Sequence, residues 1–85
     1  MIKIIEHIDD WNTRLKWVNP HNISGLSVSN KKWVEFNDFD RTQNAHRLTN
    51  VFIQGMEGSI EVRDTPDVIV RSCLQWERKC RLPSP

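Results

Sequence analysis

One tetrapeptide, Asp64-Thr65-Pro66-Asp67, separates two different apolar patterns and so limits the folds that this chain can adopt. Before it, Ile60 and Val62 alternate with polar residues, which is typical of a strand with one buried face. After it, apolar side chains recur at steps of four, three and four, as on one face of a helix: Ile69, Cys73, Trp76 and Cys80. Val70 is expected to widen this stripe. A strand and a helix therefore meet here, and both must bury their apolar sides against a core.

The same tetrapeptide carries the signals of a helix start. Thr65 is a favourable N-cap, because its hydroxyl can accept a backbone N–H of the first turn. Pro66 suits the first helical position, where no N–H is needed and the ring already fixes φ. Asp67 complements the positive end of the helix dipole. We predict a helix over about residues 65–81.

Period-two alternation predicts strands elsewhere in the chain, over residues 1–8, 13–19, 26–36, 51–54 and 59–64. The first two stretches are separated by turn-forming residues and should pair as a hairpin. The last two should pair around the turn between Gly55 and Gly58. The middle stretch can form one strand, or two strands that meet at Asn30-Lys31. Ile23 follows a break at Pro20 and should reach the core from a short turn.

These elements predict an α+β fold, namely a small antiparallel β-sheet of 4–5 strands packed by one C-terminal α-helix. With 85 residues the chain should make a single domain, residues 1–85. A domain of this size buries only about 60–65% of the surface that its unfolded chain exposes. Its stability should be modest, and we expect a homo-oligomer that buries a further face.

Charge and cysteine content argue against several classes of protein. The formal net charge of +1 does not suit a dedicated binder of double-stranded DNA, which would be strongly basic. No window approaches the ~20 apolar residues that span a bilayer, and residues 1–11 lack the apolar core of a signal peptide. We therefore expect a cytoplasmic protein with no membrane partner. Cys73 and Cys80 would lie ~10.5 Å apart along one helix, too far for a disulfide.

No residue set has the spacing of a catalytic or metal-binding motif, so we expect no enzymatic activity, no cofactor and no metal. His7, His21 and His46 are not spaced to share a metal with the cysteines or carboxylates. No serine or cysteine stands in a nucleophile motif. The Gly-x-x-Gly stretch at residues 55–58 holds Met and Glu rather than basic residues, which favours a hairpin turn over the phosphate clamp of a KH domain.

Residues 37–50 are polar and lack clear periodicity, which indicates a long loop, and long loops in small domains are often functional. Many of their side chains can donate hydrogen bonds, and together with a nearby indole they form a candidate ligand-binding set: Trp33, Arg41, Asn44, His46, Arg47 and Asn50. Such a set can hold a nucleotide, with arginine on phosphate, amides on base edges and the indole stacked on the base. A solvated polar loop explains the same composition.

Structural residues near both ends of the chain follow a pattern known from small bacterial proteins: Met1-Ile2, Val18-Asn19-Pro20, Ile23, Gly58, Ile60, Val62, Thr65 and Val68-Ile69. In these residues the chain resembles the FlbD/SwrD-type flagellar accessory domain and its uncharacterised phage and bacterial relatives. The resemblance covers about half of the chain, and residues 27–49 depart from it as an insertion. It implies a compact β-sheet with one packed helix, transfers no active site, and suggests a phage or prophage accessory protein.

Three functions remain open. The first, which we favour, is a non-catalytic binding module, a phage or prophage accessory (counter-defence) protein that binds a host protein or sequesters a small nucleotide. The second is a single-stranded nucleic-acid binder whose affinity falls with salt, using Trp33, Lys31, Lys32, Arg41 and Arg47. The third is a structural, flagellar-type accessory domain that works through protein contacts alone, with the polar stretch as an ordinary connector.

Overall fold

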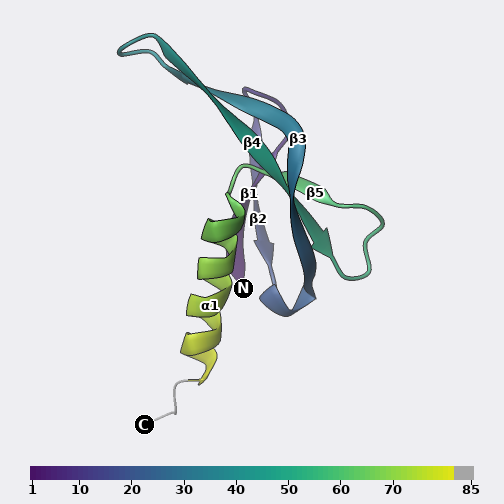
Figure 1. Cartoon of the computed structure of the whole chain (residues 1–85). Helices are drawn as coiled ribbons and strands as arrows, with labels where there is room; N and C mark the ends of the chain where they lie inside the picture. Colours follow the sequence, from purple (N-terminus) through teal and green to yellow (C-terminus); the bar gives the residue numbers. More distant parts are fainter. Residues whose placement is uncertain (82–85) are drawn as a thin grey trace.

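A computed structural model of the chain describes residues 1–81, and side chains as far as Lys79. In this range the chain forms five strands, a short 3₁₀-helix and one α-helix (Figure 1). Their bounds are β1 Ile2–His7, β2 Thr13–Val18, η1 Pro20–Asn22, β3 Ile23–Asn37, β4 Thr42–Ile53, β5 Ile60–Val62 and α1 Pro66–Arg81. The strands make one antiparallel sheet in the order β2-β1-β5-β4-β3, which confirms the predicted α+β class.

The two edge strands of the sheet, β2 and β3, are consecutive in the chain, and this connection requires the sheet to curl. Between Val18 and Ile23 the chain can span at most about 18 Å when fully extended, and η1 shortens that reach. The edges of a flat five-stranded sheet would lie about 19 Å apart. The N–H of Gln54 donates to the carbonyl of Asn22 at 2.6 Å and ties the end of β4 to η1.

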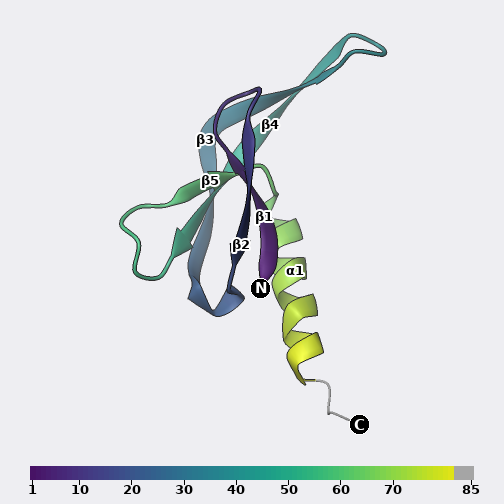
Figure 2. The ribbon, with the colours of Figure 1, turned by 180° about the vertical axis from the view of Figure 1, so that it is seen from behind.

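One face of the curled sheet carries the hydrophobic core. Its buried side chains are at most 7% exposed and come from four strands and the helix: Ile2, Ile4, Val18, Val51, Ile60, Val62 and Ile69. Ile23 packs against this cluster as predicted, and so do Cys73 and Trp76 of α1. Figure 2 shows α1 running alongside the N-terminal part of β1.

The predicted apolar stripe of α1 is confirmed in part. Ile69 is fully buried, and Cys73 and Trp76 are partly buried on the core, where burial raises the pKa of the Cys73 thiol. Cys80 lies outside the described side chains. The prediction for Val70 is wrong, because its side chain is 48% exposed. It follows Ile69 by ~100° around the helix and so turns away from the sheet.

The junction between β5 and α1 connects three parts of the fold. The N–H of Arg63 donates to the carbonyl of Ile5 at 2.9 Å, and the N–H of Ile5 donates to Oδ1 of Asp64 at 2.8 Å. A side-chain carboxylate thus extends the ladder between β1 and the three-residue strand β5. One residue later, Oγ1 of Thr65 accepts the N–H of Val68 at 3.3 Å, as expected of an N-cap.

Replacing Thr65 with alanine should therefore lower the free energy of unfolding by about 1 kcal/mol, since the N–H of Val68 loses its acceptor. Urea denaturation followed by circular dichroism measures the difference. Thr65→Ser keeps the hydroxyl and should retain most of the stability. If the serine and alanine variants are equally destabilised, the hydroxyl does not act as a cap.

The prediction of a long loop over residues 37–50 is wrong. Residues 42–53 form β4, which pairs with β3 along its length, and the connection is a turn at residues 38–41. Alternation appears in a sequence where one face of a strand is buried, but every residue from 34 to 47 is exposed. Backbone pairing holds this ribbon together without a buried face. We call residues 32–47 the arm, and Figure 1 shows it projecting away from the rest of the sheet.

The remaining strand predictions agree with the structure. The first two strands form the predicted hairpin, and β4 and β5 pair around a turn in which Gly55 and Gly58 have φ of 87° and 77°. These values explain both glycines, because other residues rarely adopt positive φ. The middle stretch is one strand, with residues 29–31 of β3 opposite Leu48 alone. This irregularity marks the start of the arm.

Candidate functional site

The base of the arm holds a cluster of aromatic and charged side chains. Trp33 on β3 lies directly opposite His46 on β4, and their rings stack with centroids 4.8 Å apart and planes 29° from parallel. The Nε2 atom of His46 is 3.0 Å from Oε2 of Glu35. The Nε1 atom of Trp33 is buried and has no hydrogen-bond partner within the described residues. A buried donor without an acceptor costs free energy.

Arg63 joins this cluster to the opposite hairpin of the sheet. Its guanidinium lies over the Trp33 ring, 4.4 Å from the centroid. Its Nε donates to Nδ1 of His7 at 3.2 Å, and its Nη2 donates to the carbonyls of Asp9 and Asp10 at 3.0 and 3.1 Å. One side chain at the end of β5 therefore contacts the arm, β1 and the β1–β2 turn, and holds them in a fixed arrangement.

The β1–β2 turn is itself held by the carboxylate of Asp9. Asn12 donates to this carboxylate through its side-chain amide and its N–H, and Trp11 donates through its N–H, at distances of 2.8 to 3.0 Å. The amide of Asn12 and then the N–H of Trp11 lower the pKa of Asp9 below its usual range. This tight turn presents Asp10 and Trp11 toward the arm, with Trp11 87% exposed.

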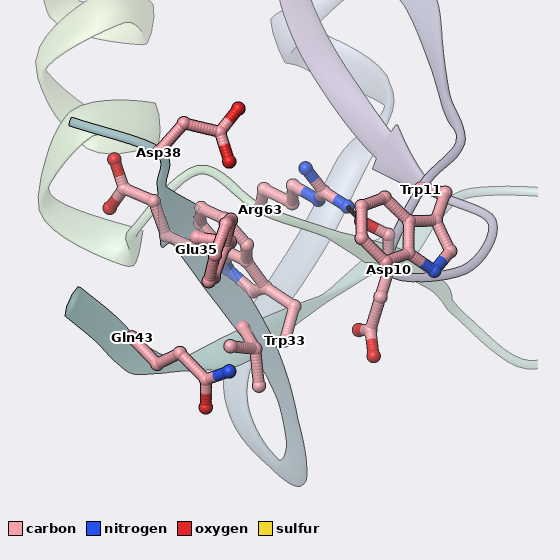
Figure 3. A pocket seen from close by; sticks show the side chains of 9 residues that line it. Asp10, Trp11, Trp33, Glu35, Asp38, Gln43 and Arg63 are labelled. Atoms are coloured by element: carbon pink, nitrogen blue, oxygen red, sulfur yellow. Dashed lines mark hydrogen bonds between the residues drawn. The ribbon is translucent and has the colours of Figure 1, made fainter. Parts of the chain in front are cut away.

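A cavity of about 690 Å³ lies between this turn and the arm (Figure 3). We call it the groove, and it is lined by Asp10, Trp11, Trp33, Val34, Glu35, Phe36, Asp38, Gln43 and Arg63. Its volume falls within the range of pockets that take small-molecule ligands. Three of the lining residues are aromatic, three carry carboxylates and one carries a guanidinium.

A second cavity of about 510 Å³ shares Trp33, Glu35 and Arg63 with the groove. Its further lining comes from the arm, from β3 and β4, and from the start of α1: Val28, Ala45, His46, Arg47, Thr49, Thr65 and Pro66. Arg47 and Arg63 give it a more basic lining than the groove has. The two cavities thus differ in charge although they share the indole and the guanidinium.

The structure brings some of the predicted site residues together and separates others. Trp33, His46 and Arg47 line the second cavity. Asn44 lies on the arm opposite Glu35, and Arg41 lies at the turn of the arm with φ of 56°. Asn50 lies in the sheet, where its Nδ2 donates to Oγ of Ser27 at 3.3 Å. The predicted residues therefore do not form one cluster.

The tip of the arm has a defined conformation. Oδ1 of Asn37 accepts the N–H of Phe39 at 3.0 Å, and Oδ1 of Asp40 accepts the hydroxyl and the N–H of Thr42 at 2.7 and 3.2 Å. The two bonds from Thr42, led by the one from its hydroxyl, lower the pKa of Asp40. Between them the side chain of Phe39 is fully exposed to solvent. The tip is thus a fixed turn that presents an aromatic ring.

The basic residues suggested for binding single-stranded nucleic acid do not form a common surface. Nζ of Lys31 is 3.2 Å from Oε1 of Glu61 on β5, so its charge is paired. Lys32 lies opposite Arg47 at the base of the arm, and Arg41 lies at its tip. The arm balances three basic residues with three acidic ones: Lys32, Arg41 and Arg47 against Glu35, Asp38 and Asp40. A polyanion would find little net attraction along it.

Among the side chains described, those of residues 1–79, there is no group of three or more His, Cys, Asp or Glu that could hold a metal ion. None of the helices described is long and apolar enough to span a bilayer. The chain was compared with models of protein families, with curated proteins and with solved structures, and none of them matches it. The resemblance to flagellar accessory domains stays a prediction.

Proposed function

We propose that this chain is a non-catalytic binding module that binds a host protein through its arm. It would act in the cytoplasm as a phage or prophage accessory (counter-defence) protein. The observation that supports this most is the exposure of the arm, whose side chains include Val34, Phe36 and Phe39. A two-stranded ribbon without a packed face is marginally stable in water. Exposed apolar side chains on such an element are typical of protein interaction sites.

The ordered tip favours recognition over a simple connector. Oδ1 of Asn37 accepts the N–H of Phe39, and Oδ1 of Asp40 accepts two bonds from Thr42, so the backbone that carries the Phe39 ring is ordered before any partner arrives. Pre-organisation of this kind reduces the entropy lost on binding. The flagellar-type alternative also works through protein contacts, but it treats residues 37–50 as a passive linker, which does not account for a capped turn.

The test is to identify the partner and then to measure its affinity for defined variants. The chain is purified from its own host cells, native mass spectrometry reports any retained protein or nucleotide, and the purified partner is titrated by calorimetry. Phe39→Ser should weaken binding on the order of tenfold or more, since central aromatic side chains dominate interface energies. Leu74→Ser, a similar change on the exposed side of α1, is the control. Equal affinities of these two variants would contradict the proposal.

The same spectra test the expected homo-oligomer. Ile5, Leu15 and Trp17 lie on the face of β1 and β2 opposite the core and are more than a third exposed. We propose this surface for self-association, because an apolar sheet face of this kind is more stable when another surface covers it. A monomer at micromolar concentration would exclude it.

A second candidate function is the sequestering of a small nucleotide, and the basic cavity favours it. Arg47 and Arg63 line that cavity beside Thr65 and the start of α1, where the helix dipole also attracts anions. A nucleotide retained in native spectra and lost in Arg47→Ala would support it. Against it, the ring of Trp33 is already contacted by His46 and Arg63, so a base could stack on it only after one of them moved.

A further inference from the structure

We infer that the groove takes an arginine- or lysine-bearing segment of the partner protein, with the cationic side chain between the carboxylates and the aromatic rings. The inference deepens the proposed function and rests on it. The occupant is a basic peptide segment. Free polyamines and nucleotides are outcomes of the test.

The charge of the groove is the first reason. Asp10, Glu35 and Asp38 line it with three carboxylates against the one guanidinium of Arg63. Neither Asp10 nor Asp38 forms an ion pair with any residue in the described part of the chain. An anionic cavity with unpaired carboxylates attracts a cation and repels the phosphates of a nucleotide.

The aromatic lining is the second reason. Trp11 on the β1–β2 turn and Phe36 on the arm both line the groove, and both residues are exposed. Cations bind over the faces of such rings, and arginine does so most often. The protein already contains one example, because the guanidinium of Arg63 lies 4.4 Å from the Trp33 centroid. A second cation from a partner would meet the same chemistry at Trp11 and Phe36.

A peptide suits the groove better than a small polyamine does. The volume of about 690 Å³ exceeds what one extended side chain fills. The Nε1 atom of Trp33 needs an acceptor, and a peptide offers a carbonyl at each residue, whereas a polyamine offers donors alone. Because Nε1 is buried, a carbonyl reaches this N–H only when the side chains that cover it move aside. The main chain of the segment then pairs with the indole while its basic side chain meets the carboxylates.

The inference is tested with short synthetic peptides and the whole chain. The probe is acetyl-Gly-Arg-Gly-Arg-Gly-amide, and its control replaces both arginines with citrulline, which has the same shape without the charge. Binding is followed at low salt by the NMR signals of the four indole N–H groups. We expect the arginine peptide to shift the signals of Trp11 and Trp33 and the citrulline peptide to leave them in place.

Matched variants locate the effect. Asp10→Asn with Asp38→Asn should weaken binding of the arginine peptide about tenfold, at roughly threefold for each exposed carboxylate. Trp11→Ala should weaken it about threefold. The control removes the same charge from exposed positions outside the groove, with Glu57→Gln and Asp67→Asn. Circular dichroism is used to check that each variant folds.

Three results would overturn the inference: equal binding of the citrulline peptide, equal loss in the control variant, or tighter binding of spermidine or AMP than of the peptide at the same signals. The proposed function can fail separately. If the purified partner binds Phe39→Ser as well as it binds the native chain while the groove variants lose the peptide, the arm proposal is wrong and the cation site stands. If Phe39→Ser no longer binds the partner and the groove variants bind peptide and partner unchanged, the cation site is wrong and the arm proposal stands.

Discussion

Replacing Ile69 with alanine should lower the free energy of unfolding by about 2–5 kcal/mol. The side chain of Ile69 is 1% exposed and packs α1 against the core side chains of β1, β2, β4 and β5. The alanine would leave a cavity between the helix and a curled sheet that cannot close around it. A domain of this size has only about 5–15 kcal/mol of stability in total. The loss should therefore be visible as a large fall in the urea midpoint.

The control for this prediction lies on the same helix. Leu74 is 52% exposed, so Leu74→Ala removes a similar group with little loss of buried surface and should cost about 0.5 kcal/mol or less. The helix propensity of alanine is high, which removes propensity as an explanation for either result. If the two variants are equally stable, α1 does not pack on the sheet through Ile69.

The junction at Asp64-Thr65-Pro66-Asp67 shows what could be predicted from this sequence. The alternation before it and the helical stripe after it both arise from burial on one face of an element, and burial leaves a period in the sequence. The N-cap at Thr65 is local as well, since its hydroxyl and the N–H that it accepts are three residues apart. Features of this kind are visible without any knowledge of the fold.

The arm shows where such reasoning fails. Its second strand has no buried face over residues 42–47, so no apolar period marks that strand. One signal was available, because the turn-forming residues Asn37, Asp38 and Asp40 directly follow the stretch predicted as a strand. The valine, tryptophan and phenylalanine of Trp33-Val34-Glu35-Phe36 favour a strand, and that strand needed a partner. The polar residues 42–47 are that partner.

Only part of the candidate site could be predicted from the sequence. Trp33, His46 and Arg47 could be selected by chemical type, and the pairing of β3 with β4 brings them together. Arg63 was missed, because its role depends on contacts with His7 and with the β1–β2 turn more than 50 residues away in the chain. No local pattern marks an arginine that will bridge distant hairpins. Such residues become visible when the strand order is known.

Replacing Arg63 with alanine should have the second large effect, at about 2–3 kcal/mol of unfolding free energy. The change removes the bonds to Nδ1 of His7 and to the carbonyls of Asp9 and Asp10. It also removes the cation over Trp33, worth about 0.5–1 kcal/mol at a partly exposed position. The turn that carries Trp11 would no longer be fixed to the base of the arm. The groove should then lose its shape, so the NMR signals of Trp11 and Trp33 should move and the arginine peptide should no longer shift them.

Arg63→Lys separates the geometry of this contact from its charge. An ammonium keeps the positive charge but cannot place one donor on an imidazole and another on two carbonyls in a fixed fork. The lysine variant should therefore recover less than half of the lost stability. Arg71→Ala, at an exposed position on α1, controls for the loss of a positive charge and should cost about 0.5 kcal/mol or less. Urea denaturation and the indole signals measure stability and groove shape independently. Full recovery by lysine would mean that charge alone acts here, and the fork of hydrogen bonds would then not be what fixes the arm to the turn.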